Sequence, residues 1–192
     1  GGGGGGKDYY LAIIQKFDVC FSVVGEFTIS FTAKASKAMS IGVEITRSYG
    51  SGGSSTDTAV VTEKVDLTTS FKDYTITATM PSLSGKTLGS DTGDIGLFFW
   101  MSAGTSYNSR ASSIGLQTGI VDITDVQVEP GPVATPFEHR PIATELALCS
   151  RYYKTVPILW FNLSGFENNS SGIQALWNFD IPMRTTPTLD YS

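Results

Sequence analysis

The sequence predicts an all-β protein: a jelly-roll-like β-sandwich followed by a proline-rich connector, a short helix and a small β-rich tip. Up to residue 130, short runs of alternating apolar and polar residues are separated by turns rich in Gly, Ser and Thr. No run with helical spacing occurs before Thr144. Four of the eight prolines lie between residues 130 and 141, and each fixes its own φ and removes a backbone donor, which excludes a helix or a central strand there.

The same observations divide the chain into segments. Residues 1–7 are a glycine tract, treated as a linker or placeholder, and residues 8–130 form the sandwich. Residues 131–143 are the connector, residues 144–155 the helix, and residues 156–192 the β-rich segment. We expect the natural chain to continue at both ends, because a glycine tract is an unusual start and the last residues directly follow a strand-like run.

The clearest predicted strand is 27–35, because its alternation is strict. Its core-facing residues are Phe27, Ile29, Phe31, Ala33 and Ala35, and its outward residues are Thr28, Ser30, Thr32 and Lys34. The next run places Ile41, Val43 and Ile45 inward, with Glu44 and Thr46 outside. Residues 71–80 alternate again, with Tyr74, Ile76, Ala78 and Met80 inward.

Other strands are less regular. One is expected near residues 17–24, one over 60–67, and one or two within 114–128. In the last of these the inward set changes parity between Ile123 and Val126, which predicts a β-bulge at Thr124–Asp125. The run 95–101 is apolar on both faces, and a polar loop over 105–113 follows it.

The outward side of the 95–101 strand is the best candidate for binding. Sugars stack their C–H faces on aromatic rings, while nearby amides and charged groups bind the hydroxyls. Phe98 and Trp100 could form such a platform, with Tyr107, Asn108 and Arg110 as its polar rim. The alternative is that Phe98 and Trp100 belong to the core or to a trimer interface.

No catalytic constellation is found, so we expect no enzyme. His139 is the only histidine and lies in the connector, and neither Cys20 nor Cys149 has metal-ligand spacing. Both cysteines are expected to be buried free thiols. Two carboxylate pairs occur, Asp91/Asp94 and Asp122/Asp125. Asp91 and Asp94 lie in a Gly-rich loop and fit solvated turn residues; a structural calcium ion is the next interpretation, but no spacing identifies its ligands.

Charge and hydropathy exclude two further classes of partner, nucleic acid and the membrane interior. The formal net charge is −5 and the sequence pI is about 4.8, which argues against nucleic acid as the main partner. No stretch is apolar for long enough to be a membrane helix.

The expected helix points to self-association. Thr144 would cap it, Glu145 suits its positive end, and Arg151 and Lys154 suit its negative end. So short a helix is marginal alone and must dock on the sandwich or on copies of itself. The candidate interface residues of the helix and the tip are Leu146, Cys149, Tyr153, Trp160, Trp177 and Phe179.

The stretch from Val121 to Lys154 resembles a junction found in bacteriophage tail-fibre and related virion proteins, where a sandwich resembling a carbohydrate-binding module precedes it. The first matching pattern is Q-x-E-x-G-x-x-A-T-P-F-E-x-R-P, at residues 127–141, and the second is E-L-x-x-C-x-R-Y-Y, at residues 145–153. The later run from Phe179 to Leu189 is similar to a strand that follows in such fibres.

This resemblance implies a virion structural protein, a tail fibre or tail-associated part, that forms a homotrimer with other virion proteins as neighbours. Its localisation would be the virion, and its role would include attachment to a host-surface glycan. Two rivals stay open. One is a spacer or decoration module of the virion without host contact, and the other is a carbohydrate-binding module of a secreted glycanase.

Overall fold

The computed structural model describes residues 9–17, 24–89, 93–153, 180–183 and 186. The chain divides into two compact units, Gly1–Phe137 and Glu138–Ser192. The strands of the first unit are β1 (Tyr10–Phe17), β2 (Gly25–Ala35), β3 (Met39–Arg47), β4 (Asp57–Leu67), β5 (Lys72–Met80), β6 (Ile95–Ala103) and β7 (Val121–Pro130). The second unit contains α1 (Ile142–Cys149).

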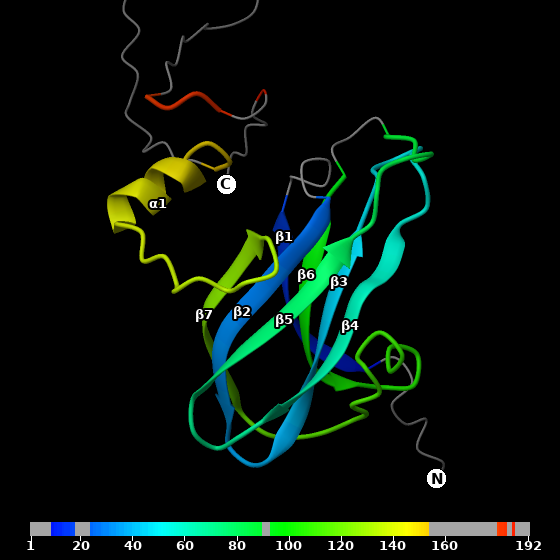
Figure 1. Cartoon of the computed structure of the whole chain (residues 1–192), viewed down its shortest axis with the longest axis vertical. Coiled ribbons are helices and arrows are strands. Elements are labelled where there is room, and N and C mark those ends of the chain that lie inside the picture. Colours follow the sequence, from blue (N-terminus) through cyan, green and yellow to red (C-terminus); the bar gives the residue numbers. More distant parts are fainter. Residues whose placement is uncertain (1–8, 18–23, 90–92, 154–179, 184–185, 187–192) are drawn as a thin grey trace, which may run out of the picture. The chain divides into compact units, whose positions relative to one another are not determined.

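The first unit is a β-sandwich of two antiparallel sheets, which confirms the predicted fold class (Figure 1). One sheet has the order β1-β6-β3-β4 and the other the order β5-β2-β7. Neighbours in each sheet are mostly distant in sequence, so the connections cross between the sheets. Apolar side chains from the inner faces fill the space between them, as sandwich packing requires.

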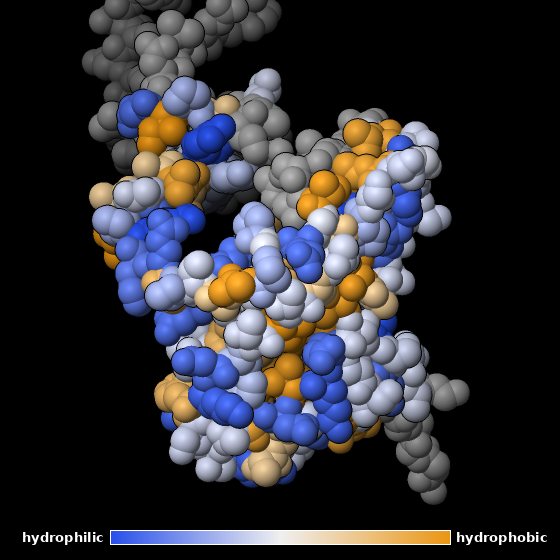
Figure 2. All heavy atoms as spheres, viewed as in Figure 1, coloured by the Kyte–Doolittle hydropathy of each residue, from blue (hydrophilic) through white to orange (hydrophobic). Residues whose placement is uncertain are grey.

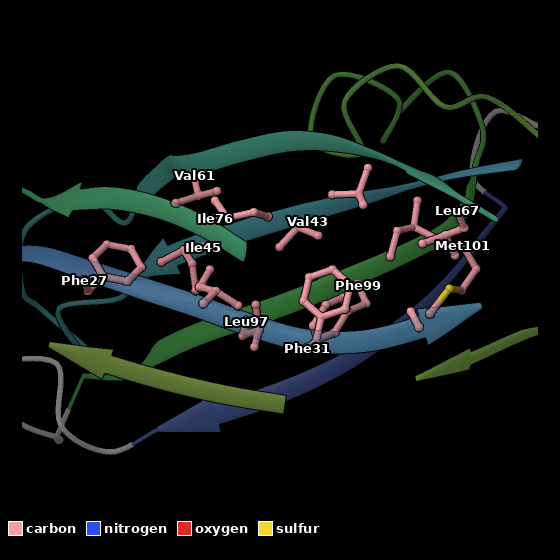
Figure 3. Close-up of a cluster of buried hydrophobic side chains, with 14 of the residues drawn as sticks. Phe27, Phe31, Val43, Ile45, Val61, Leu67, Ile76, Leu97, Phe99 and Met101 are labelled. Atoms are coloured by element: carbon pink, nitrogen blue, oxygen red, sulfur yellow. The ribbon is translucent and has the colours of Figure 1, made fainter. Parts of the chain in front are cut away.

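The core confirms the alternation read from the sequence. Phe27, Ile29, Phe31, Ala33 and Ala35 of β2 are all buried, as are Ile41, Val43 and Ile45 of β3. They pack against the inward residues of β6 (Figure 3), and the rings of Phe31 and Phe99 meet edge to face at 5.1 Å. The residues of 27–35 expected to face away from the core do so, although Thr28 is covered.

The predicted bulge in β7 is confirmed. Ser30 of β2 pairs with Gln127 and Thr32 pairs with Thr124, so one residue of β2 lies opposite two residues of β7. Those two are Asp125 and Val126, and Asp125 has a φ of 53°. Asp tolerates this left-handed conformation better than most residues, which allows the bulge to form without glycine.

The first described strand, β1, runs from Tyr10 to Phe17, where the sequence predicted no strand. The strand expected near 17–24 lies almost entirely outside the described part, because residues 18–23 are not described. β1 is an edge strand with apolar residues on both faces, so it shows no alternation. Its exposed large apolar residues are Tyr10, Leu11, Ile13 and Ile14. Of the one or two strands expected within 114–128, the structure contains one, β7, which begins at Val121.

In the second unit, α1 begins two residues before Thr144, which corrects the predicted cap. Pro141 occupies the N-cap position with φ −57° and ψ 138°, and no side chain caps the helix. The backbone N–H of Thr144 donates to the Pro141 carbonyl at 2.9 Å, so Thr144 already lies inside the first turn. A proline here already has a fixed φ and no N–H that needs a partner. The helix ends at Cys149, so the expected basic last turn is missing.

The exposed apolar surface is not evenly distributed. On the face viewed in Figure 2, hydrophobic residues form separate patches among hydrophilic ones.

Cys149 is exposed, so the expectation of a buried thiol is wrong for this residue, while Cys20 lies outside the described part. No helix among the described residues is long and apolar enough to cross a membrane.

Candidate binding surface

The candidate site lies on the outer face of the four-stranded sheet, away from the core. Strand alternation places Phe98 and Trp100 of β6 on this face. In the β3–β6 register, Glu44 lies beside Phe98 and Gly42 beside Trp100. Tyr10 of the edge strand reaches the same face, because its ring lies 5.5 Å from that of Trp100.

A covering segment, residues 104–115, folds over this face. It is closed at its base by a hydrogen bond from the Ala103 N–H to the Gly115 carbonyl, at 2.9 Å. Gly42 permits the close approach, since a Cβ there would lie 2.6 Å from the Ala111 carbonyl oxygen. The predicted polar loop over 105–113 is therefore a packed cap, and its own residue Ala111 is fully buried against the sheet.

The cap buries an ion pair. Arg110 donates from Nε to Glu44 Oε1 at 2.8 Å and from Nη2 to Oε2 at 3.0 Å. The Trp100 indole N–H donates to Glu44 Oε2, also at 3.0 Å. Glu44 has no exposed surface, which corrects the expectation that it lies outside. A carboxylate removed from water is tolerated only with such partners, and a bidentate arginine is a strong one.

Aromatic rings surround the ion pair. Phe98 and Trp100 stack with centroids 5.7 Å apart, and Trp100 and Tyr107 with centroids 6.0 Å apart. The Arg110 guanidinium lies over both Phe98 and Trp100, at 5.1 and 5.2 Å from their centroids. Tyr10 closes the group, with its ring 4.6 Å from that of Tyr107. The guanidinium is thus held by cation–π contacts as well as by Glu44.

The structure gathers the predicted glycan-binding residues but changes their roles. Trp100 is 1% exposed, so it cannot present a ring face to a sugar; for Trp100 the packing alternative describes the structure. Asn108 Oδ1 accepts the Gly115 N–H at 2.8 Å and so shapes the cap. Phe98 and Tyr107 are half-buried, and the Arg110 side chain is 35% exposed.

Sequence reasoning missed two members of the site. Tyr10 was overlooked because the sequence predicted no strand over residues 10–17, and it is half exposed beside Trp100 and Tyr107. Glu44 was assigned to solvent because it falls on the outward parity of β3. The available signal was Gly42, since a glycine inside a strand often marks a close backbone approach.

The predicted carboxylate pairs do not converge on a metal. Among the described residues there is no group of three or more His, Cys, Asp or Glu side chains that could hold a metal ion. Asp94 pairs with Lys16 at 2.7 Å and Asp122 with Lys34 at 3.5 Å, while Asp91 lies outside the described part. His139 is exposed.

The predicted interface residues fall into two groups. Leu146, Cys149 and Tyr153 are exposed, and no residue of α1 is buried. The remaining residues, Trp160, Trp177 and Phe179, lie outside the described part of the chain.

Comparisons with known proteins add little to this geometry. No family model matches the chain, and no curated protein matches it significantly. A solved structure described as "CBM4 structure and function" is similar, with 21% identity and a TM-score of 0.42. The match covers 62% of this chain and 61% of that chain, which is less than two thirds of the solved chain. Fold and site thus define an antiparallel β-sandwich protein with a capped aromatic and ionic cluster.

Proposed function

We propose that this chain is a structural protein of a bacteriophage virion, in a tail fibre or tail-associated part, that assembles as a homotrimer and contributes to attachment to a host-surface glycan. The junction patterns at residues 127–141 and 145–153 support the virion role. The observation that carries the assembly is the helix α1, whose apolar residues are all exposed. The proposal assigns binding, not catalysis.

The exposed residues of α1 and the turn after it favour self-association. Leu146 is 62% exposed and Tyr153 is 74% exposed, and they are joined by Ile142, Leu148 and Tyr152. A helix of this length is unstable alone in water, and apolar clusters of this kind usually mark interaction sites. Packing around a three-fold axis would bury the same residues on every copy, and other virion proteins would be the further neighbours.

The attachment surface would be the exposed rim of the capped cluster. Tyr10, Phe98 and Tyr107 offer partly exposed ring surface, and Arg110 offers N–H groups beside them. Such a shallow surface suits a weak contact with one sugar. Three copies on one stalk would raise the affinity through effective concentration, without any further contact.

The oligomer is tested on the full chain by sedimentation equilibrium. We expect the mass of three chains, and a shift towards one chain for Leu146→Glu, because a charge would be placed among apolar side chains. Thr144→Glu is the matched control, since it adds the same charge on another side of the same helix. A wild-type mass of one chain would refute the trimer.

Attachment is tested on an array of bacterial lipopolysaccharide and capsular glycans, and on intact candidate host cells. We expect the trimer to bind and Tyr10→Ala and Phe98→Ala to weaken binding about tenfold, as for loss of a stacked ring. Tyr9→Ala is the control, because Tyr9 is adjacent in sequence and 71% exposed. If Tyr10→Ala and Phe98→Ala bind the glycan as well as Tyr9→Ala and the wild type do, the glycan does not bind on this surface.

The spacer module is the second candidate, and the burial of Trp100 favours it. An intact trimer that binds neither the array nor a known host would support the spacer. A carbohydrate-binding module of a secreted glycanase is the remaining reading, and a catalytic domain on the same polypeptide would support it. In either virion reading the protein is located on the particle and is extracellular when displayed.

A further inference from the structure

The residues that follow β7 turn back onto the sandwich. The Gly131 N–H donates to the Glu26 carbonyl at the start of β2, at 2.8 Å. Gly131 has a φ of 98°, a conformation that is accessible to glycine and strained for other residues. The chain therefore changes direction at the first residue after the strand.

A pair of threonines on the outer face of the β5–β2–β7 sheet receives the connector. Thr28 of β2 donates its hydroxyl to the Gly131 carbonyl at 2.7 Å. Thr77 of β5 lies opposite Thr28 and donates to the Pro132 carbonyl at 3.3 Å. Thr28 faces away from the core and yet has no exposed surface. Residues 131–132 thus lie against the sheet instead of leaving it.

A carboxylate on β7 holds the next part of the connector. Glu129 Oε1 accepts the backbone N–H of Thr135 at 2.7 Å, and Oε2 accepts the Thr135 hydroxyl at 2.9 Å. Gln127 donates its side-chain amide to Glu129 and to the Thr135 hydroxyl, the latter at 3.0 Å. Gln127 and Glu129 are on the same face of β7, in register with Ser30 and Thr28. Hydrogen bonds to an ionised group are stronger than neutral ones.

We propose that Gln127, Glu129 and Thr135, with Thr28, form a latch that holds residues 131–135 against the sandwich and fixes the direction in which the chain leaves it. Without these bonds, residues 131–135 would act as a short flexible linker, and the following residues would sample many directions. With them, the sandwich dictates the path of the chain as far as Thr135.

The latch explains why polar residues are needed at these places. Its acceptors on the connector are carbonyl groups that a proline-rich segment leaves without strand partners, because prolines cannot extend the ladder. Its one charged member, Glu129, satisfies both donors of Thr135 at once. This role does not depend on glycan binding or on a virion location, so it stands or falls separately from the proposed function.

The latch is tested on the full chain by amide hydrogen exchange, followed by mass spectrometry. Glu129→Ala is expected to increase exchange in the peptide covering residues 131–137 about tenfold, because the Thr135 amide loses an ionised acceptor. The matched control is Asp122→Ala, which removes a carboxylate from the same face of β7 that pairs with Lys34 instead. Thr28→Val, which is close in shape but has no hydroxyl to donate to the Gly131 carbonyl, should increase hydrogen exchange near Gly131.

The outcomes separate a latch from general support of the fold. Faster exchange confined to 131–137, with unchanged exchange in 27–35 and in the control variant, confirms the latch. Unchanged exchange of 131–137 in Glu129→Ala overturns it. Faster exchange throughout β2 and β7 also overturns it, since Glu129 would then stabilise the sandwich and not the connector.

Discussion

At the scale of single residues, Glu44 is one of two charged side chains that are fully buried in the described sandwich, and Arg47 is the other. Glu44 has no exposed surface and accepts hydrogen bonds from both Arg110 and Trp100. A pair of this kind need not stabilise the fold more than two apolar residues would. The ion pair instead holds the cap in position, because Arg110 belongs to the cap and Glu44 belongs to strand β3 of the sheet.

Removing one partner of this pair should be costly. We expect Arg110→Met to lower the free energy of unfolding by about 2–4 kcal/mol, since it leaves a buried carboxylate with the indole N–H as its remaining donor. The lower part of the range allows for the exposed third of Arg110. Urea denaturation measures the change.

The double variant Glu44→Met/Arg110→Met is the informative companion. It should lose less stability than Arg110→Met, because no buried charge remains unpaired. Asp122→Asn, in an exposed pair, should change stability by less than about 0.5 kcal/mol. If Arg110→Met lowers the free energy of unfolding as little as this control does, the Glu44 carboxylate is hydrated in the variant.

Asp57 should make stability depend on acid pH. Burial by itself raises the pKa of Asp57, but hydrogen bonds from Lys86 and Tyr49 outweigh it and hold the pKa below its usual value. Because the folded-state pKa is the lower one, the stabilisation is complete above the unfolded-state pKa of about 3.9 and is lost as the pH falls through the folded value. Asp57→Asn should flatten this part of the curve of unfolding free energy against pH.

The pH dependence of Asp57 can be separated from that of the latch. Hydrogen bonds from Thr135 and Gln127 also lower the pKa of Glu129, so both groups act in the same acid range. Hydrogen exchange of residues 131–137 reports on Glu129, whereas the contribution of Asp57 to global unfolding is the part of the acid slope that Asp57→Asn removes. An acid slope that Asp57→Asn leaves unchanged would contradict the assignment.

At the scale of elements, the contact between β3 and the cap depends on a missing side chain. Gly42→Ala would place a Cβ 2.6 Å from a backbone oxygen of the cap, which cannot rotate away. We expect a loss of about 1–3 kcal/mol and faster hydrogen exchange in residues 104–115. If hydrogen exchange in residues 104–115 stays slow, the added Cβ is accommodated by a shift of the sheet and not of the cap.

The bulge of β7 gives a second prediction at this scale, in which glycine is the tolerated substitution. Asp125 adopts a left-handed conformation that costs a β-branched residue about 1–2 kcal/mol. Asp125→Val should therefore destabilise by about that amount, whereas Asp125→Gly should be close to neutral. Thermal unfolding of the two variants compares them directly, and equal melting temperatures would show that the bulge moves at no cost.

At the scale of the whole molecule, the two units differ in how they satisfy their apolar residues. The first unit buries a continuous core between its sheets, while α1 has no buried residue. We therefore expect a chain ending at Phe137 to fold cooperatively and remain monomeric, at concentrations where the proposed trimer of the full chain would form. Light scattering checks the mass and calorimetry the transition. A trimeric sandwich would move the interface to the first unit.

What the sequence determined by itself is the pattern with period two. The alternation from Phe27 to Ala35 identified the inner face of β2, and the change of parity near Asp125 located the bulge. These features are local, because a strand must send successive side chains to opposite faces. The proline-rich connector was also readable, since each proline restricts the backbone around it.

Only the tertiary structure decided which outward faces stay in water. Glu44 and Trp100 have the parity of solvent-facing residues, but a cap 66 residues from Glu44 covers both of them. Thr28 is covered in the same way by a connector 103 residues away. Alternation reports the face on which a side chain lies, whereas burial depends on which distant segment packs over that face, and a local period carries no information about such contacts.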